Sequence, residues 1–283
     1  MRPHTASSQR VVTLDMQALG DIHKALLGHE SREMPPPWCC GFTFRDTGMR
    51  CGLRQREGGP CGVLAAVQAY VLRDVIGRFE GDVDVHSVSP KEAGEALVSA
   101  LGHIIWSARV GRVASVASCK CTELPPLRAA AGEIMVSTCN SQADVVAAVR
   151  STISVYRSER GPGVPLLLYS LVLTRGIGMI GRDADFPTPL IMSNGYCSQE
   201  LVNLVLLGRA HSNVFDGERS VGGSDDVNRS EDGCRLRGVP KRSHIGFLTL
   251  FERQGYVSLL TMSNSRRCAH SLIAQTSHIS HRL

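Results

Sequence analysis

The sequence has 283 residues, of which 43% are hydrophobic and 20% are charged, and its formal net charge is +5. This composition is typical of a globular protein and excludes a mainly disordered or fibrous chain. The positive charge is small for this length and is not gathered in one basic block, so the sequence predicts no nucleic-acid partner. The longest strongly apolar run, 164–173, is far shorter than the ~20 residues that span a bilayer. Because the polar N-terminal segment leads into no signal-peptide region, we expect an intracellular protein without a membrane partner. The expected location is the cytoplasm, and the nucleus is left open.

Capping residues and apolar periodicity predict most of the helices. The first clear helix begins at Cys61 or Gly62 and continues to about residue 76, with its apolar residues on one face. The next begins after Ser89, because a serine, a proline and a glutamate at Glu92 have the spacing of an N-cap, a first helical position and a capping box. A later helix is expected to begin after Ser198 and to end at Gly208.

Strands are predicted mainly in the rest of the chain. Short strand-like segments lie at 112–118 and 133–138, and Ser141 then caps another helix. The continuous apolar run 164–174 is interpreted as a buried strand, and 244–252 as the last strand. These elements predict an α+β fold with a strand-rich C-terminal half.

The ten cysteines do not have the spacing of a disulfide framework or of a metal site. No Cys-x-x-Cys pair occurs, and the nearest approach to a ligand pair is Cys119-x-Cys121. Without a secretory signal we expect these thiols to remain reduced. The sequence therefore predicts no metal and no organic cofactor.

Cys61 stands apart from the other cysteines. It follows two glycines and a proline at the start of the first clear helix, where unpaired N–H groups and the helix dipole favour a thiolate. Gln55, six residues upstream, can donate its amide, together with the Cys61 N–H, to the oxyanion of an attacked carbonyl. Gly58, Gly59 and Gly62 would leave room for a substrate backbone, so we interpret them as lining a substrate channel.

The spacing of Gln55 and Cys61 is that of papain-like cysteine peptidases and suggests a papain-like arrangement with the nucleophile at a helix N-terminus. The alternative is that Cys61 is merely a buried residue at a helix start and Gln55 a solvated loop residue. The glycine-proline turn, the helix start and the amide donor coincide here, and together they favour a nucleophile.

The segment around Cys61, GLRQREGGPCGVLAAVQAYVL, resembles the active-site segment of the MINDY family of deubiquitinases, in the branch of the third and fourth members. Further similarity lies, in the same order, in SPKEAGEALVSALGHIIWSARVG, LLLYSLVLTRGI, SQELVNLVLLGRAHSNVFDG and IGFLTLFE. The resemblance is greatest to the B paralogue of the fourth member, which is regarded as inactive.

The resemblance implies a cysteine isopeptidase that hydrolyses polyubiquitin chains, preferably lysine-48-linked, with ubiquitin and polyubiquitin as partners. By position, Cys61 would be the nucleophile and Gln55 the oxyanion-hole glutamine. It also implies a catalytic domain at 38–257 that is incomplete at its C-terminal end. A partly flexible lead-in segment at 1–37 and a divergent Ser/His-rich tail at 258–283 would flank it.

The catalytic histidine is the main departure from the family. The family supplies it from a His-Phe-Ser-type strand beyond the segment that resembles IGFLTLFE, and no such motif follows here. His270, His278 and His281 lie in the tail without a strand-like context, and His211, 150 residues after Cys61, is expected to be a partly exposed loop residue. Three hypotheses follow: an active deubiquitinase, a pseudoenzyme that binds ubiquitin chains without cutting them, and an adaptor with no affinity for ubiquitin.

Overall fold

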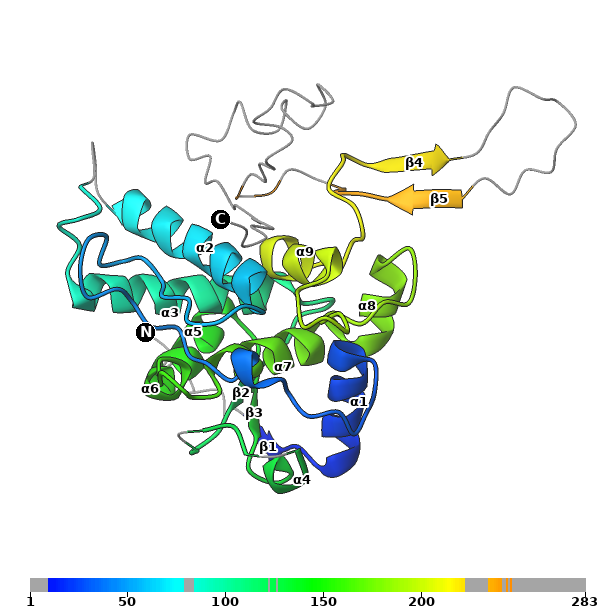
Figure 1. Cartoon of the computed structure of the whole chain (residues 1–283), viewed down its shortest axis with the longest axis horizontal. Coiled ribbons are helices and arrows are strands. Elements are labelled where there is room, and N and C mark those ends of the chain that lie inside the picture. The colour runs from blue at the N-terminus through cyan, green and yellow to red at the C-terminus, as the bar shows by residue number, and fades with distance from the viewer. Residues whose placement is uncertain are drawn as a thin grey trace, which may run out of the picture.

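A computed structural model describes residues 10–78, 84–221 except 122 and 126, and 234–245 except 241, 242 and 244. Its elements follow in chain order from blue to orange in Figure 1: β1 (Val11–Thr13), α1 (Met16–Leu27), a 3-10 turn (Pro36–Trp38), α2 (Cys61–Arg78), α3 (Pro90–Ser107), β2 (Ala114–Ser118), α4 (Leu127–Ala130), β3 (Met135–Cys139), α5 (Gln142–Ser151), α6 (Ile153–Tyr156), α7 (Gly163–Arg175), α8 (Ile177–Asp183), α9 (Gln199–Leu207), β4 (Glu218–Val221) and β5 (Cys234–Arg237). In this part of the chain no single helix has the length and hydropathy to cross a bilayer. The pair α7 and α8 passes that test only together, and it is bent by 83° at its break.

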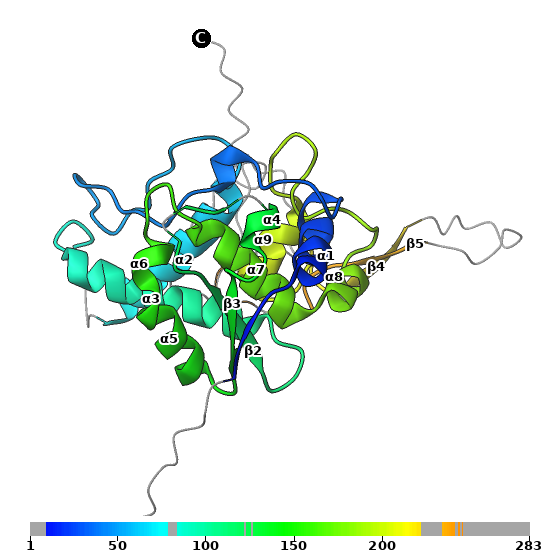
Figure 2. The same ribbon diagram turned by 90° about the horizontal axis from the view of Figure 1, so that it is seen from below.

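A three-stranded antiparallel sheet has the order β1-β3-β2. Val136 in the middle strand lies between Val12 and Ala117 of its two neighbours. The predicted strands at 112–118 and 133–138 are thereby confirmed as β2 and β3. Figure 2 shows the sheet beside α7, which packs against β2, and α5, which packs against β2 and β3.

The outer edge of β2 is closed by side chains from the helices. The backbone N–H of Ser115 donates to the Thr174 hydroxyl at 2.9 Å, and that of Ala117 donates to the Ser170 hydroxyl at 2.8 Å. The Tyr156 hydroxyl donates to the Ala117 carbonyl oxygen at 2.7 Å. An open strand edge would leave these backbone groups unpaired, so the hydroxyls of α6 and α7 replace a fourth strand.

The run 164–174, predicted as a buried strand, is instead the helix α7. Nearly every residue of α7 is buried, because this helix lies between β2 and α3. A segment that is apolar on all sides has no period, so its sequence does not distinguish a buried strand from a buried helix. Pro165 lies in the first turn of α7, where the N–H that proline lacks has no partner within the helix.

The expected strand-rich C-terminal half is also wrong for the described residues. From residue 142 to residue 207 the chain forms α5 to α9, and the antiparallel pair of β4 and β5 is the only strand pair that follows within the described residues. The α+β class is confirmed, with helices dominating. The predicted strand at 244–252 lies, apart from Ile245, outside the described residues.

The predicted helix caps are confirmed in detail. The Ser89 hydroxyl accepts from the Glu92 N–H, and the Glu92 carboxylate accepts from the Ser89 N–H at 2.8 Å, which completes the capping box of α3. The hydroxyls of Ser141 and Ser198 accept from the N–H groups of Asp144 and Leu201 and so cap α5 and α9. Gly208 ends α9 with a φ of +70°, a backbone conformation that glycine adopts without strain.

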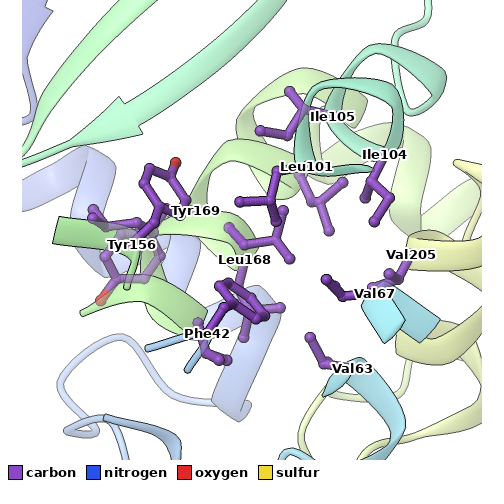
Figure 3. Close-up of a cluster of buried hydrophobic side chains, with 14 of the residues drawn as sticks. Phe42, Val63, Val67, Leu101, Ile104, Ile105, Tyr156, Leu168, Tyr169 and Val205 are labelled. Carbon is purple, nitrogen blue, oxygen red and sulfur yellow. The ribbon is translucent and has the colours of Figure 1, made fainter. Parts of the chain in front are cut away.

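The main core lies where α2, α3, α7 and α9 meet. Figure 3 shows buried side chains of these helices in one cluster: Val63 and Val67 from α2, Leu101, Ile104 and Ile105 from α3, Leu168 from α7, and Val205 from α9. Because α2 and α9 both contribute to this core, their packing places the N-terminal end of α2 against α9.

The core also extends into the predicted lead-in segment 1–37. Leu19, Ile22 and Leu26 on α1 are almost completely buried, and α1 packs against α7 and α8. Apolar burial therefore begins upstream of residue 38, the predicted start of the catalytic domain.

Candidate active site

Cys61 is the first residue of α2, as predicted. The Pro60 carbonyl oxygen accepts the first helical hydrogen bond, from the Leu64 N–H at 2.9 Å. The Cys61 side chain is half-buried, and its Sγ atom lies 3.8 Å from the Gly59 carbonyl oxygen. The 18-residue helix α2 thus presents the positive end of its dipole at this thiol.

Gln55 lies in the exposed loop that leads to Cys61. Its side-chain amide donates to the Glu57 carbonyl oxygen at 3.0 Å. The structure therefore places Gln55 on the same loop as Cys61, with its amide directed at the backbone of that loop.

Gly59 has a structural reason to be glycine. Its φ is +126°, and an added Cβ atom would lie 3.0 Å from Nε1 of Trp38. That indole N–H donates to the Gly195 carbonyl oxygen at 2.9 Å. Trp38 therefore ties the segment 192–197 to the loop in front of Cys61.

Gly62 also has its open side filled by the protein. An added Cβ atom would lie 2.8 Å from Cγ2 of Val202 and 3.1 Å from Sγ of Cys197. By contrast, nothing lies within 4 Å of a Cβ atom built at Gly58. Of the three glycines predicted to line a substrate channel, Gly58 has free space beside it, whereas Gly59 and Gly62 permit close packing.

Replacing Gly62 with alanine is expected to lower the free energy of unfolding by about 1–3 kcal/mol, because the new methyl group would overlap Val202. The measurement is urea unfolding followed by circular dichroism. Adding Val202→Ala should recover part of the loss by removing the methyl group that is overlapped. Gly58→Ala is the matched control and should change stability by less than about 0.5 kcal/mol. Equal stability of the two alanine variants would refute the packing role of Gly62.

A cleft of about 490 Å³ lies beside the loop in front of Cys61. Arg54, Arg56, Pro60 and Leu64 line one wall, and the carboxylate of Glu159 faces them. Glu159 pairs with Arg54 at 3.4 Å and also with Arg56. Both of these arginines lie on the loop that leads to Cys61, so the ion pairs with Glu159 connect that loop to the segment after α6.

His211 lies in a loop, as expected, but it is buried, and the expected partial exposure is wrong. Only 6% of its surface is exposed, because the segment after α9 folds back and the Asn203 amide donates to the His211 carbonyl oxygen at 2.7 Å. Neither ring nitrogen has a hydrogen-bond partner of good geometry among the described residues. Burial lowers the pKa of His211, and the nearby Asp183 opposes this with a smaller effect.

The groups that act on His211 are Asp183, Arg175 and Arg209, and no described contact joins it to Cys61. The other candidate histidines, at 270, 278 and 281, lie outside the described residues. Among the residues that are described, no group of three His, Cys, Asp or Glu side chains could hold a metal ion.

We expect His211 to make the domain less stable in mild acid. Its pKa is lowered in the folded state, so below pH ~6.5 this histidine binds a proton in the unfolded chain but not in the folded chain, and protonation then favours unfolding. Each pH unit below that value should remove up to about 1.4 kcal/mol until the folded-state pKa is reached. Urea unfolding at several pH values should show a smaller loss for His211→Leu than for the original protein. The exposed His86→Gln should leave the slope unchanged, and an unchanged slope in His211→Leu would contradict the prediction.

Cys197 is the residue at this site that the sequence did not indicate. Its Sγ atom lies 3.6 Å from the Gly59 carbonyl oxygen and 3.1 Å from a Cβ atom built at Gly62. Cys197 is 136 residues from Cys61 in the sequence and belongs to no recognisable motif. Only the packing of α9 on α2 reveals it.

Comparison with known proteins shows the family of the chain. A family model described as "Deubiquitinating enzyme MINDY-3/4, conserved domain" matches residues 23–260. The chain is similar to the probable ubiquitin carboxyl-terminal hydrolase MINDY-4 of Xenopus tropicalis, 35% identical over 281 residues, covering 94% of this chain and 36% of that protein. The Mus musculus protein of the same description is 36% identical over 286 residues, covering 94% of this chain and 37% of that protein.

The ubiquitin carboxyl-terminal hydrolase MINDY-3 of Danio rerio is 29% identical over 276 residues, covering 86% of this chain and 59% of that protein. No solved structure matches the chain. The chain thus spans 36% to 59% of the length of these relatives, and the family model covers most of it. The chain belongs to the MINDY-3/4 family of deubiquitinating enzymes.

Proposed function

We propose that the chain is a cysteine-type deubiquitinase domain with Cys61 as its nucleophile. The observation that carries this proposal is a half-buried thiol at the N-terminal end of an 18-residue helix, within the matched family domain. The reaction is hydrolysis of an isopeptide bond after the ubiquitin C-terminus. On the family resemblance, the preferred substrates are lysine-48-linked chains.

The reaction passes through a thioester. The Cys61 thiolate attacks the isopeptide carbonyl, the lysine nitrogen takes up a proton from water and leaves as the amine, and water then hydrolyses the thioester. The Cys61 N–H and the Gln55 amide stabilise the oxyanion, which requires Gln55 to turn from the Glu57 carbonyl toward the thiol. The flexible ubiquitin C-terminus ends in small residues, and it approaches along Gly58 and the backbone of Gly59, with Gly62 supporting the helix start.

The pseudoenzyme is the second candidate function. A thiol nucleophile needs a base or ion-pair partner, and within the described residues no histidine contacts Cys61. The hydrogen bond from Gln55 to Glu57 also directs the amide donor at the loop backbone. Such a protein would bind ubiquitin chains through the same surface without cutting them, as the resemblance to the inactive B paralogue implies.

Ubiquitin carrying a C-terminal electrophile separates these functions. We expect a covalent adduct with the original chain and none with Cys61→Ala, whereas the control Cys121→Ala keeps it. Gln55→Ala should slow adduct formation by about 10²–10³-fold if it forms the oxyanion hole. Measurable binding of lysine-48-linked tetraubiquitin without any adduct or cleavage would establish the pseudoenzyme. Absence of adduct, cleavage and binding would overturn both and leave an adaptor.

A further inference from the structure

Two thiols occupy the start of α2. The Sγ atoms of Cys61 and Cys197 lie 3.8 and 3.6 Å from the same atom, the carbonyl oxygen of Gly59. Both thiols are free and half-buried. Cys197 is held in place by a β-bridge to Ile191 and by the helix α9 that follows it.

Gly62 allows Cys197 to come this close. A Cβ atom built at Gly62 would lie 3.1 Å from Sγ and 3.4 Å from Cβ of Cys197, closer than ordinary packing allows. Cys61 is the adjacent residue, with its Cα atom about 3.8 Å from that of Gly62. A disulfide requires the two Cβ atoms to lie about 3.5–4.5 Å apart. The side chains of Cys61 and Cys197, which surround one carbonyl oxygen, can reach that separation.

We propose that Cys61 and Cys197 form a reversible disulfide when the domain meets hydrogen peroxide. Cys61 is oxidised first, and Cys197 then resolves the product. The order of these steps rests on the proposed function, in which Cys61 is the reactive nucleophile. The proximity of the two sulfur atoms does not depend on it.

The oxidation takes place in two steps. The Cys61 thiolate attacks one oxygen of hydrogen peroxide, the O–O bond breaks, and Cys61 becomes a sulfenic acid while hydroxide leaves and takes up a proton as water. The Cys197 thiol then loses its proton and attacks the Cys61 sulfur, so that the S–S bond forms and a second water leaves. The two thiols supply the two electrons that reduce the peroxide, and an external dithiol reverses the oxidation.

The surroundings of Cys197 suit the second step. Burial raises the pKa of Cys197 to about 11, and the neighbouring Cys61 adds to this, so Cys197 stays a thiol and is not the first to be oxidised. The backbone N–H groups of Gly62 and Val63 act in the opposite direction and stabilise negative charge on its sulfur. They are therefore placed to stabilise the Cys197 thiolate when it forms beside the sulfenic acid.

The disulfide would switch the site off and protect it. In the disulfide, Cys61 has no thiolate to attack a substrate carbonyl. It also cannot proceed to the sulfinic acid, which external thiols do not reduce. Cys197 thus acts as a protecting residue for the nucleophile.

Peptide mass spectrometry tests the pair directly. The reduced chain is treated with limiting hydrogen peroxide, its free thiols are alkylated, and it is digested without reductant. We expect a cross-linked peptide pair that contains Cys61 and Cys197 and disappears after dithiothreitol. The pair should be absent from Cys197→Ser, in which a sulfenic-acid reagent should instead label Cys61. The half-buried Cys121→Ser is the matched control and should keep the pair.

Labelling with the ubiquitin electrophile then reports the consequence. Peroxide should abolish adduct formation. Dithiothreitol should restore it in the original chain and in Cys121→Ser. In Cys197→Ser treated with excess peroxide, dithiothreitol should not restore it. Oxidation of Cys61 without the cross-linked peptide, or a Cys61 thiol unchanged by peroxide, would overturn the inference. If the reduced chain forms no adduct but the cross-link appears, the proposed catalysis fails while the redox pair stands.

Discussion

Replacing Asp183 with alanine is expected to lower the free energy of unfolding by about 3–5 kcal/mol, the largest loss we expect from a single side chain. Asp183 and Arg175 are 5% and 4% exposed, and they form a two-bond ion pair, Nε to Oδ2 at 2.7 Å and Nη2 to Oδ1 at 2.5 Å. Asp183 also accepts from the Ala210 N–H at 3.0 Å. Alanine would leave a buried guanidinium without its counter-charge and a buried N–H without its acceptor.

Two variants test that explanation. In the double variant Arg175→Met with Asp183→Leu, both charges are removed, so it should lose less stability than Asp183→Ala alone. Asp46→Ala removes a carboxylate that pairs with Arg54 at the surface and should cost less than about 1 kcal/mol. Chemical unfolding measures all three. If the double variant is as unstable as Asp183→Ala, the loss arises from packing or from Ala210, and the unpaired charge is not its cause.

Gly208→Ala is expected to lower the free energy of unfolding by about 2–5 kcal/mol, because alanine would be strained in a left-handed backbone and its methyl group would clash with α3. Gly208 has a φ of +70°, and its added Cβ atom would lie 2.2 Å from the Ser107 carbonyl oxygen and 2.8 Å from the Ala108 nitrogen. These are backbone atoms at the end of α3, so they cannot move aside by a change of rotamer. The variant should therefore separate the C-terminal ends of α3 and α9.

Gly195→Ala separates the two contributions. Gly195 has a similar φ of +82°, and nothing lies within 4 Å of an added Cβ atom. This variant should show only the backbone cost, about 1–2 kcal/mol. Thermal and urea unfolding of both variants give the comparison. Equal losses would mean that the contact between Gly208 and α3 contributes nothing.

Much of the helical structure could be predicted, because the signals that start and stop a helix act over a few residues. The Ser89 capping box, the Ser198 cap and the Gly208 terminus are all local patterns, and each occurs where the sequence predicts it. The position of Cys61 at a helix start was predictable for the same reason, because neighbouring residues form both the turn before it and the apolar face after it.

The rest depended on contacts between distant segments. The run 164–174 is uniformly apolar, and its helical conformation was evident only once it lay between β2 and α3. His211 could not be recognised as buried, because its shielding comes from the fold of the segment after α9 over Asn203. The orientation of the Gln55 amide is likewise set by the loop backbone that it meets.

The sequence by itself determined the composition of the domain, its family, the positions of its helix caps and the placement of Cys61 at a helix N-terminus, since these follow from residues close together in the chain. The tertiary structure alone decided which side chains surround that thiol. Cys197 reaches it across 136 residues because α9 packs on α2 and Gly62 has no Cβ atom. Of the ten cysteines, one stood out by its local pattern, and a second joins it through the packing of two helices.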